Sequence, residues 1–416
     1  MTPDMPADLF ARKQPGVTLS DTLAQLDMKR LRGHRLGRLR QQLKKHDVGG
    51  CVLMDGINVR YATGSRNMQL WTIRSTARYV FVATEGPVVL FEFAGCDHLS
   101  KGLETVTELR PATTWFFFTS GPRVPERAKK WAAELADLLK THVGGNKRLA
   151  VDRVNPIGLA ALTDLGVEVV DANPAVEVAR SIKSVDEVAC LYAALSVCEA
   201  AFAKLREELR PGITENELWS HLHQVNIARG GEYIETRLLN SGARTNPWFQ
   251  ESSDKVIRAG ELVAVDSDMY GLYGYFADMS RTFFCEPGKP TGAQRTAYGL
   301  AHEQVHHNIG LLKPGVGFRE FAEKSWKMPE AYYPNRYMSI IHGAGLCGEY
   351  PYIPYAGDFA ARGYDGTIEE NMTLCVESYM GASGGTDGVK LEQLVLVTKN
   401  GAVPLSTFPW EDQLLG

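Results

Sequence analysis

The chain has 416 residues, more than a single hydrophobic core usually serves, so two domains are expected. Its composition, 44% hydrophobic and 23% charged, is that of an ordinary globular protein, and a net charge of −4 without any basic run argues against a nucleic-acid partner. No apolar stretch approaches the length of a membrane span and the N-terminus lacks the features of a signal peptide, so neither a transmembrane helix nor secretion is expected.

The first 180 residues alternate between strand and helix patterns. Residues 1–27 are predicted to form a loose N-terminal arm, and the basic segment Arg30–His46 is predicted to be a helix with a solvated face. The other expected elements are strands at Gly49–Met54, Tyr79–Ala83, Val88–Phe93, Arg148–Asp152 and Val167–Val170, and a helix at about Pro125–His142. This alternation predicts an α/β domain over residues 28–180.

A different pattern begins near residue 180. The sequence Ser184-Val-Asp-Glu187 has the form of a helix-capping box and precedes an apolar-periodic helix from about Asp186 to Leu209. A Pro-Gly turn ends this helix, and a second Pro-Gly turn follows another helix predicted at residues 291–312. The repetition indicates a second domain, residues 181–416, with two related halves.

Five carboxylates and one histidine stand out in this second domain: Asp266, Asp268, Asp278, His342, Glu377 and Glu392. Asp266 and Asp268 lie two residues apart in a strand-like run, so they are expected to share one face, and Asp278 is placed on the return strand of a hairpin. Taken singly, each could be a cap, a salt-bridge partner or a core histidine. Five carboxylates in one core would repel and protonate unless cations lay among them, so the set predicts two divalent metal ions.

The order of these residues, and the His342-Gly-Ala-Gly345 context, resemble the pita-bread superfamily of methionine aminopeptidases, Xaa-Pro dipeptidases and creatinase. The doubled Asp266-x-Asp268 narrows the resemblance to the iron-type dimethylsulfoniopropionate (DMSP) lyases of that fold. Other stretches that resemble these lyases are Asn58–Thr63, Asn67–Trp71, Gly230–Leu239 and Ser241–Gln250. The resemblance implies a creatinase-type α/β N-terminal domain, an α+β pita-bread C-terminal domain that carries a binuclear metal site, and a homodimer. It implies iron as the metal, with Mn, Zn and Co as alternatives.

Pita-bread peptidases place further histidines around the metal site. The corresponding segments here, Asn246–Phe249, Met338–Ile341 and Gly348–Pro351, contain none. A departing amine must be protonated, so the sequence favours a metal-dependent lyase that eliminates a leaving group from a small substrate. The alternative is an Xaa-Pro dipeptidase or creatinase-type hydrolase. A non-catalytic binding protein is a third hypothesis, although family relatives of that kind tend to lose metal ligands.

The expected reaction residues rest on the lyase resemblance. In those lyases the base is an Asp six residues after the ligand histidine, but here that position is Gly348, so the substrate need not be DMSP. Tyr337 matches the lyase pattern, and Glu349 is the nearest remaining carboxylate, so both are expected to be catalytic; Glu349 could equally be a loop residue in an ion pair. The residues expected to bind the substrate are Trp71, Trp248 and Arg237.

The expected partners are a small-molecule substrate and a second copy of the chain, with no nucleic acid and no membrane. Seven cysteines without pair spacing are typical of reduced thiols and predict a cytoplasmic location. Cys347 lies five residues after His342 and is interpreted as a packing residue, because a cysteine ligand is out of character for an oxygen-rich site.

Overall fold

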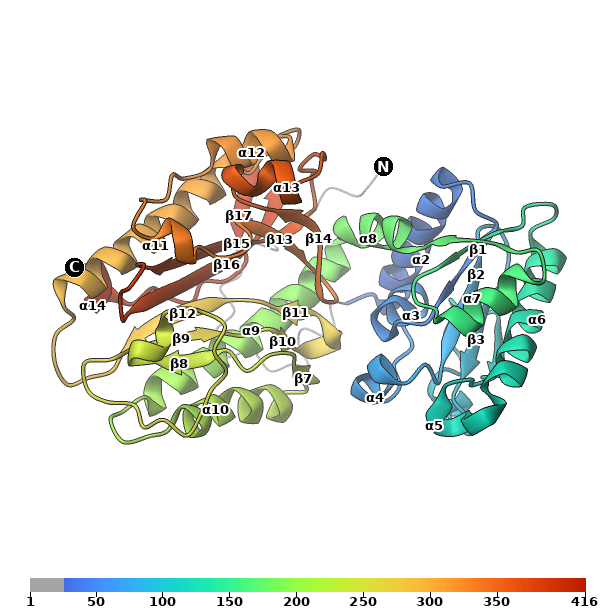
Figure 1. The fold of residues 1–416 in the computed structure, drawn as a ribbon, viewed down its shortest axis with the longest axis horizontal. Coiled ribbons are helices and arrows are strands. Elements are labelled where there is room, and N and C mark those ends of the chain that lie inside the picture. Colours follow the sequence, from blue (N-terminus) through green and yellow to red (C-terminus); the bar gives the residue numbers. More distant parts are fainter. Residues whose placement is uncertain (1–25) are drawn as a thin grey trace. The chain divides into compact units, whose positions relative to one another are not determined.

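The structure is a computed structural model that describes residues 26–416, and it divides into two compact units, Asp27–Arg180 and Ser181–Gly416 (Figure 1). The predicted N-terminal arm therefore lies almost wholly outside the described residues. Asp27, its last residue, caps the first described helix, with its side chain accepting a hydrogen bond from the Arg30 amide.

The N-terminal unit is built on a six-stranded mixed sheet in the order β4-β3-β2-β1-β5-β6. Its strands are β1 (Gly50–Leu53), β2 (Tyr79–Ala83), β3 (Val88–Glu92), β4 (Glu108–Pro111), β5 (Arg148–Val151) and β6 (Glu168–Asp171). Its helices are α2 (Met28–Lys45), α3 (Gly56–Thr63), α4 (Gln69–Arg74), α5 (Phe117–Ser120), α6 (Val124–His142), α7 (Pro156–Thr163) and α8 (Asn173–Ser181). The three central strands, β1 to β3, are buried at every residue, which is why they read in the sequence as continuous apolar runs. The predicted strands and the two predicted helices are confirmed to within about two residues.

The C-terminal unit contains two three-stranded sheets and one five-stranded sheet, in the orders β11-β10-β7, β12-β9-β8 and β14-β13-β15-β16-β17. The strands are β7 (Tyr233–Ile234), β8 (Leu239–Ser241), β9 (Leu262–Asp266), β10 (Met269–Tyr270), β11 (Phe276–Ala277), β12 (Ser280–Phe284), β13 (Ile341–Ala344), β14 (Gly348–Ile353), β15 (Thr373–Gly381), β16 (Gly388–Thr398) and β17 (Gly401–Pro404). The helices are α9 (Val185–Glu208), α10 (Glu215–Ala228), α11 (Gly292–Leu311), α12 (Phe318–Lys324), α13 (Phe359–Arg362) and α14 (Asp412–Leu415). Helices α9 and α10 lie along the small sheets and α11 packs on β15 and β16 (Figure 1). The capping box at Ser184 is confirmed, as are the two long predicted helices.

Helix α9 corrects one expectation from the sequence. By length and composition alone it is apolar enough to cross a membrane, so the prediction that no such stretch exists was wrong. Most of its apolar window, 61%, is buried within the structure, and the core helix of a globular unit has the same composition.

Candidate metal centre

Strand register brings three of the predicted ligands onto one face of the five-stranded sheet. Glu377 on β15 lies directly opposite Glu392 on β16, and His342 on β13 lies directly opposite Cys375 on β15. Because side chains two residues apart on a strand share a face, Cys375 and Glu377 point the same way. Both glutamates are buried in the core of the unit.

The three aspartates come from a hairpin that is broken where they lie. Strand β9 ends at Asp266, Asp268 follows it outside any strand with a φ of +37°, and Asp278 falls between β11 and β12. The sequence predicted that Asp266 and Asp268 share one face of a strand. This prediction was wrong, because the strand ends at Asp266. The backbone at Asp268 is left-handed, a conformation that Asp tolerates better than most residues, and the ligand atoms of Asp266 and Asp268 lie within 4.8 Å of each other. The Thr236 hydroxyl donates a hydrogen bond to the Asp268 carboxylate.

Three carboxylates, those of Asp278, Glu377 and Glu392, lie close to the imidazole of His342. Its Nε2 atom lies 3.3 Å from Glu377 Oε1, 3.6 Å from Asp278 Oδ2 and 3.7 Å from Glu392 Oε1. Its Nδ1 atom is 3.0 Å from the carbonyl oxygen of Gly343. A hydrogen bond from Nδ1 to that carbonyl fixes the tautomer in which Nε2 is free to bind a metal.

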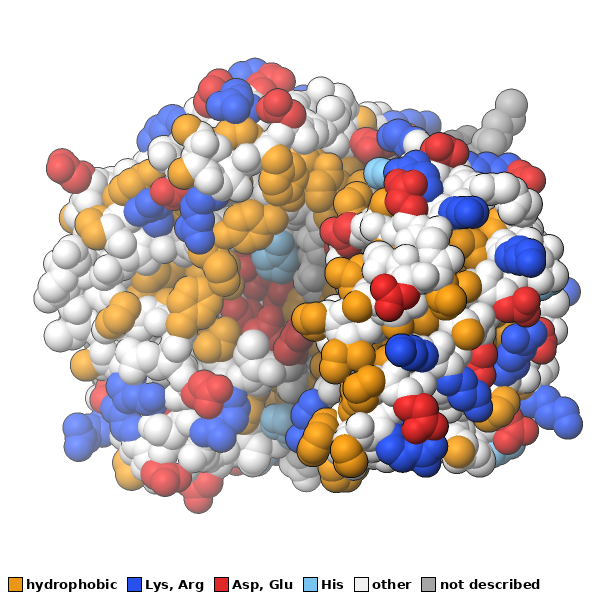
Figure 2. Space-filling view, turned by 45° about the vertical axis from the view of Figure 1, so that its right-hand side comes forward, with side chains coloured by type: hydrophobic (Ala, Val, Ile, Leu, Met, Phe, Trp, Pro, Cys, Tyr) orange, Lys and Arg blue, Asp and Glu red, His pale blue; other side chains and the backbone are white. Residues whose placement is uncertain are grey.

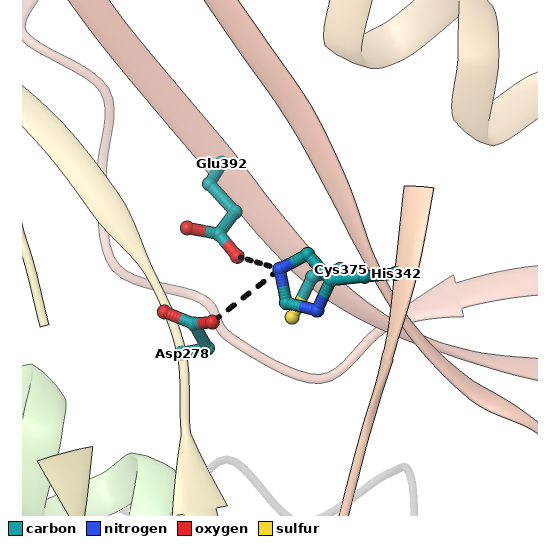
Figure 3. Close-up of side chains that lie close together, drawn as sticks. All are labelled: Asp278, His342, Cys375 and Glu392. Carbon is teal, nitrogen blue, oxygen red and sulfur yellow. Dashed lines mark ion pairs between the residues drawn. The ribbon is translucent and has the colours of Figure 1, made fainter. Parts of the chain in front are cut away.

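Ligand atoms gather at two positions that share one residue. Asp266, Asp268 and Asp278 form one group, and Asp278, His342, Cys375 and Glu392 form another, each with atoms within 4.8 Å of one another. Figure 3 shows the second group, with the carboxylates of Asp278 and Glu392 facing the same nitrogen of His342. Figure 2 shows acidic side chains and a histidine close together, with hydrophobic side chains beside them. The structure thus brings five of the six predicted ligands into two adjoining groups, and the sixth, Glu377, lies 3.3 Å from His342 Nε2.

Buried oxygens without donors show that this cluster fits a cation. Asp278 Oδ1 and Glu392 Oε1 are buried and have no hydrogen-bond partner among the described residues. Burial, reinforced by the neighbouring carboxylates, raises the pKa of Asp278 and that of Asp268 well above the usual range. Burying several carboxylates without counter-charges is unfavourable. Divalent ions bound to these oxygens and to the imidazole would offset that desolvation and repulsion.

Lys390 lies inside the cluster and was not singled out in the sequence. Its ammonium is fully buried and lies 2.6 Å from Glu377 Oε2, 3.1 Å from Asp266 Oδ2 and 3.3 Å from Glu392 Oε2. It also donates to Ser280 Oγ at 2.7 Å. Five carboxylates and one ammonium give a charge of −4, which two divalent ions would neutralise.

Replacing Lys390 with Met is expected to destabilise the metal-free protein by about 3–5 kcal/mol, because buried carboxylates lose their only ammonium partner among the described contacts. Chemical denaturation with and without chelator measures this, and saturating metal should recover part of the loss. The surface variant Lys324→Met, which removes an exposed i,i+4 ion pair with Glu320, is the control and should change stability by less than about 1 kcal/mol. Equal losses in the two variants would contradict a charge-balancing role.

The metal-free protein is expected to lose stability as the pH rises. Burial alone would lower the pKa of His342, but the hydrogen bond to Glu377 and the charges of Glu377 and Glu392 raise it from 6.5 to about 9. A group whose pKa is raised on folding stabilises below its unfolded pKa, and that contribution disappears between pH 6.5 and about 9. It amounts to on the order of 3 kcal/mol. Because metal requires deprotonated ligands, the gap in unfolding free energy between metal-loaded and chelator-treated protein should widen across this window. A constant gap would contradict this account.

Two of the predicted reaction residues lie beside the cluster. The Tyr337 ring is buried, has the Lys390 ammonium 4.6 Å from its centroid and stacks on Phe249. Burial, then the charge of Glu377, raises the pKa of Tyr337 well above its usual value, so its hydroxyl keeps its proton. Trp248 packs on Tyr379, and its indole Nε1 has no hydrogen-bond partner among the described residues.

The other three predicted reaction residues make their contacts with groups outside the cluster. The Arg237 guanidinium donates to Ser252 and Asn216, contacts that hold a loop and not the cluster. Trp71 belongs to the N-terminal unit, where it packs edge-on against Phe93. Glu349 is buried in an ion pair with Lys183, which agrees with the second interpretation of its sequence, a residue in an ion pair.

A period-two rule would have found the residues that the sequence interpretation missed. Lys390 lies two residues before Glu392, Cys375 two before Glu377, and Ser280 two after Asp278. The first two pairs share strands β16 and β15, so each pair shares a face. Ser280 Oγ lies 2.8 Å from Asp266 Oδ1 and 2.7 Å from Glu392 Oε2, which links the small sheet to the large one.

The fold and this cluster define a metal-dependent enzyme of a known class. The model of the metallopeptidase family M24 matches residues 189–399, and that of the creatinase/prolidase N-terminal domain matches residues 35–182. The chain belongs to the metallopeptidase family M24. The predicted superfamily and two-part fold are confirmed.

Within this class, the chain is similar to two lyases over nearly its whole length. It is 38% identical to the dimethylsulfoniopropionate lyase DddP of Roseovarius nubinhibens, a match that covers 95% of this chain and 90% of that protein. It is 36% identical to the enzyme of the same name from Roseobacter denitrificans, over 94% and 88% of the two chains. Among solved structures, an Xaa-Pro dipeptidase from Bacillus anthracis superposes with a TM-score of 0.74 at 22% identity, over 91% of this chain and 99% of that one, which shows the shared fold.

Proposed function

We propose that this protein is a metal-dependent lyase that removes a leaving group β to the carboxylate of a small acid, with DMSP as the first substrate to test. The observation that carries the proposal is the similarity to the DMSP lyases over 95% of the chain, together with the Asp266 and Asp268 pair retained at the cluster. We further propose iron as the metal, a homodimer as the assembly and the cytoplasm as the location.

The elimination requires loss of an α-proton and departure of the group on the β-carbon. As the C–H electron pair forms the new double bond, the bond from the β-carbon to sulfur breaks with its electrons on sulfur, so DMSP yields acrylate and dimethyl sulfide. Bound ions would hold the substrate carboxylate and stabilise negative charge that develops beside it. Asp266, Asp268, Asp278, His342, Glu377 and Glu392 would hold those ions.

The chain's own residues supply positioning and proton control. In the metal-free protein burial keeps the Tyr337 hydroxyl protonated, and a protonated hydroxyl can donate a hydrogen bond to a substrate oxygen. Trp248 and Phe249 supply aromatic surface next to it, and such rings attract a sulfonium by roughly 0.5–2 kcal/mol each. Gly348 is exposed at the start of β14 and has no side chain that could accept the α-proton.

Hydrolysis of Xaa-Pro dipeptides is the second candidate, since the solved structures with this fold include an Xaa-Pro dipeptidase. Among the described residues, His342 is the one histidine in the ion pairs of the cluster. His302 and His306 instead pack against Trp410, and His307 contacts the carbonyl of Lys324. Among the described residues no second imidazole joins these ion pairs to protonate a departing amine, which favours the lyase.

The test is a competition between the two chemistries. Metal-loaded protein is incubated with DMSP, with other carboxylates that bear a leaving group at the β-carbon, and with Xaa-Pro dipeptides, and products are identified by mass spectrometry. The proposal predicts that DMSP and the other β-substituted carboxylates give unsaturated acids and that the dipeptides stay intact. Free proline with no unsaturated acid would overturn it in favour of the hydrolase.

Glu349→Gln separates a structural from a catalytic role for this residue. The variant leaves the Lys183 ammonium buried without its carboxylate, so it is expected to lose about 3–5 kcal/mol of stability. Turnover per folded, metal-loaded molecule should stay within a few-fold of the parent. The double variant Lys183→Met/Glu349→Gln removes both charges and should recover stability. A fall in turnover of roughly 10²-fold or more, at full metal content, would instead identify Glu349 as the base.

A further inference from the structure

Cys375 lies within the cluster of metal-ligand atoms. It is fully buried on β15, directly opposite His342 on β13, and shares a face with Glu377. Its Sγ atom lies within 4.8 Å of ligand atoms of Asp278, His342 and Glu392. Figure 3 draws the sulfur next to the imidazole.

Two carboxylate oxygens in the ligand group of Cys375 have no hydrogen-bond partner among the described residues. They are Asp278 Oδ1 and Glu392 Oε1, and both are buried. One imidazole, two carboxylates and one sulfur supply four donors, and Glu377 Oε1, 3.3 Å from His342 Nε2, adds a fifth, so the group suits a four- or five-coordinate ion. The adjoining group of three aspartates offers oxygen alone.

We propose that Cys375 Sγ is a direct ligand of the ion held by Asp278, His342 and Glu392, so that the two metal positions differ in kind. The position with sulfur and nitrogen prefers a thiophilic ion such as Zn²⁺, Co²⁺ or Fe²⁺, and the all-oxygen position accepts a harder ion such as Mn²⁺. The inference rests on the metal centre that the proposed function also uses, but not on the reaction.

A thiol that coordinates a divalent ion gives up its proton, so Cys375 would bind the metal as a thiolate.

Cobalt supplies a test with a readout other than activity. Metal-free protein is titrated with Co²⁺ to two equivalents, and the near-ultraviolet thiolate-to-cobalt charge-transfer band is recorded. The band is expected in the parent, absent in Cys375→Ser and unchanged in Cys51→Ser, which alters an equally buried strand cysteine of the N-terminal unit. A band that persists in Cys375→Ser, or is missing from cobalt-bound parent, would overturn the inference.

X-ray absorption on the parent alone covers the case in which the variant does not fold. A metal–sulfur shell at about 2.3 Å, beside the nitrogen and oxygen shell at about 2.0–2.2 Å, is expected for bound zinc. A first shell of nitrogen and oxygen only would refute sulfur ligation. Lyase turnover without a sulfur shell would leave the proposed function intact and remove this inference. A sulfur shell without lyase turnover would do the reverse.

Discussion

Asp278→Ala is expected to remove both metal ions and all detectable activity. Asp278 is the one residue that the two ligand groups share, and its carboxylate lies 3.6 Å from His342 Nε2. Its loss therefore weakens both positions, whereas loss of a ligand from one group leaves the other group complete. Metal content by elemental analysis, measured beside turnover, should fall from two ions per chain toward zero.

Two further variants make this result specific. Asp278→Asn keeps the shape of the side chain but not its charge, so it should fold like the parent and still lose most of the metal. Asp365→Ala removes a carboxylate that is 92% exposed and should leave both metal and turnover unchanged. Full activity in Asp278→Ala would remove the cluster from the mechanism.

Gly348→Asp is expected to raise the rate of DMSP cleavage by roughly 10²-fold or more, the effect of a well-placed general base. The resembling lyases carry an Asp six residues after the ligand histidine, where this chain has Gly348. A side chain fits there, because a Cβ at this position meets nothing closer than Phe276 Cε1 at 4.0 Å and the backbone is not left-handed. Headspace chromatography of dimethyl sulfide measures the gain.

Gly348→Asn is the matched control for this variant. The amide has the size of the carboxylate but cannot accept a proton at neutral pH, so it should not accelerate the reaction. An equal gain from both variants would mean that the new side chain acts through packing. No gain from a folded, metal-loaded Gly348→Asp variant would mean that the surrounding pocket is built for another substrate.

Much of the fold could be predicted from local patterns. Ser184 and Glu187 form the capping box that the sequence indicates, and the strand Tyr79–Ala83 has the predicted bounds. Such features depend on residues close in the chain, so the sequence displays them directly. The six predicted ligands could be selected because their order and spacing resemble a family motif, and the structure gathers them.

The parts that failed depend on contacts between distant segments. The left-handed turn at Asp268 breaks a run that reads as one strand, and the Glu349 carboxylate meets Lys183, which lies far away in the sequence. The place of Lys390 and Cys375 in the cluster follows from how β13, β15 and β16 align, and register is set by tertiary packing. The period-two spacing puts Lys390 and Cys375 on the same faces as Glu392 and Glu377, but it does not report which strands lie side by side.

The most direct test of the lyase account is the release of dimethyl sulfide and acrylate from DMSP by the iron-loaded wild-type protein, with chelator-treated protein as the blank. The account predicts metal-dependent release of the two products in equal amounts, more slowly than by the Gly348→Asp variant. Hydrolysis of Xaa-Pro dipeptides by the same fully metallated protein, with no dimethyl sulfide released, would contradict it.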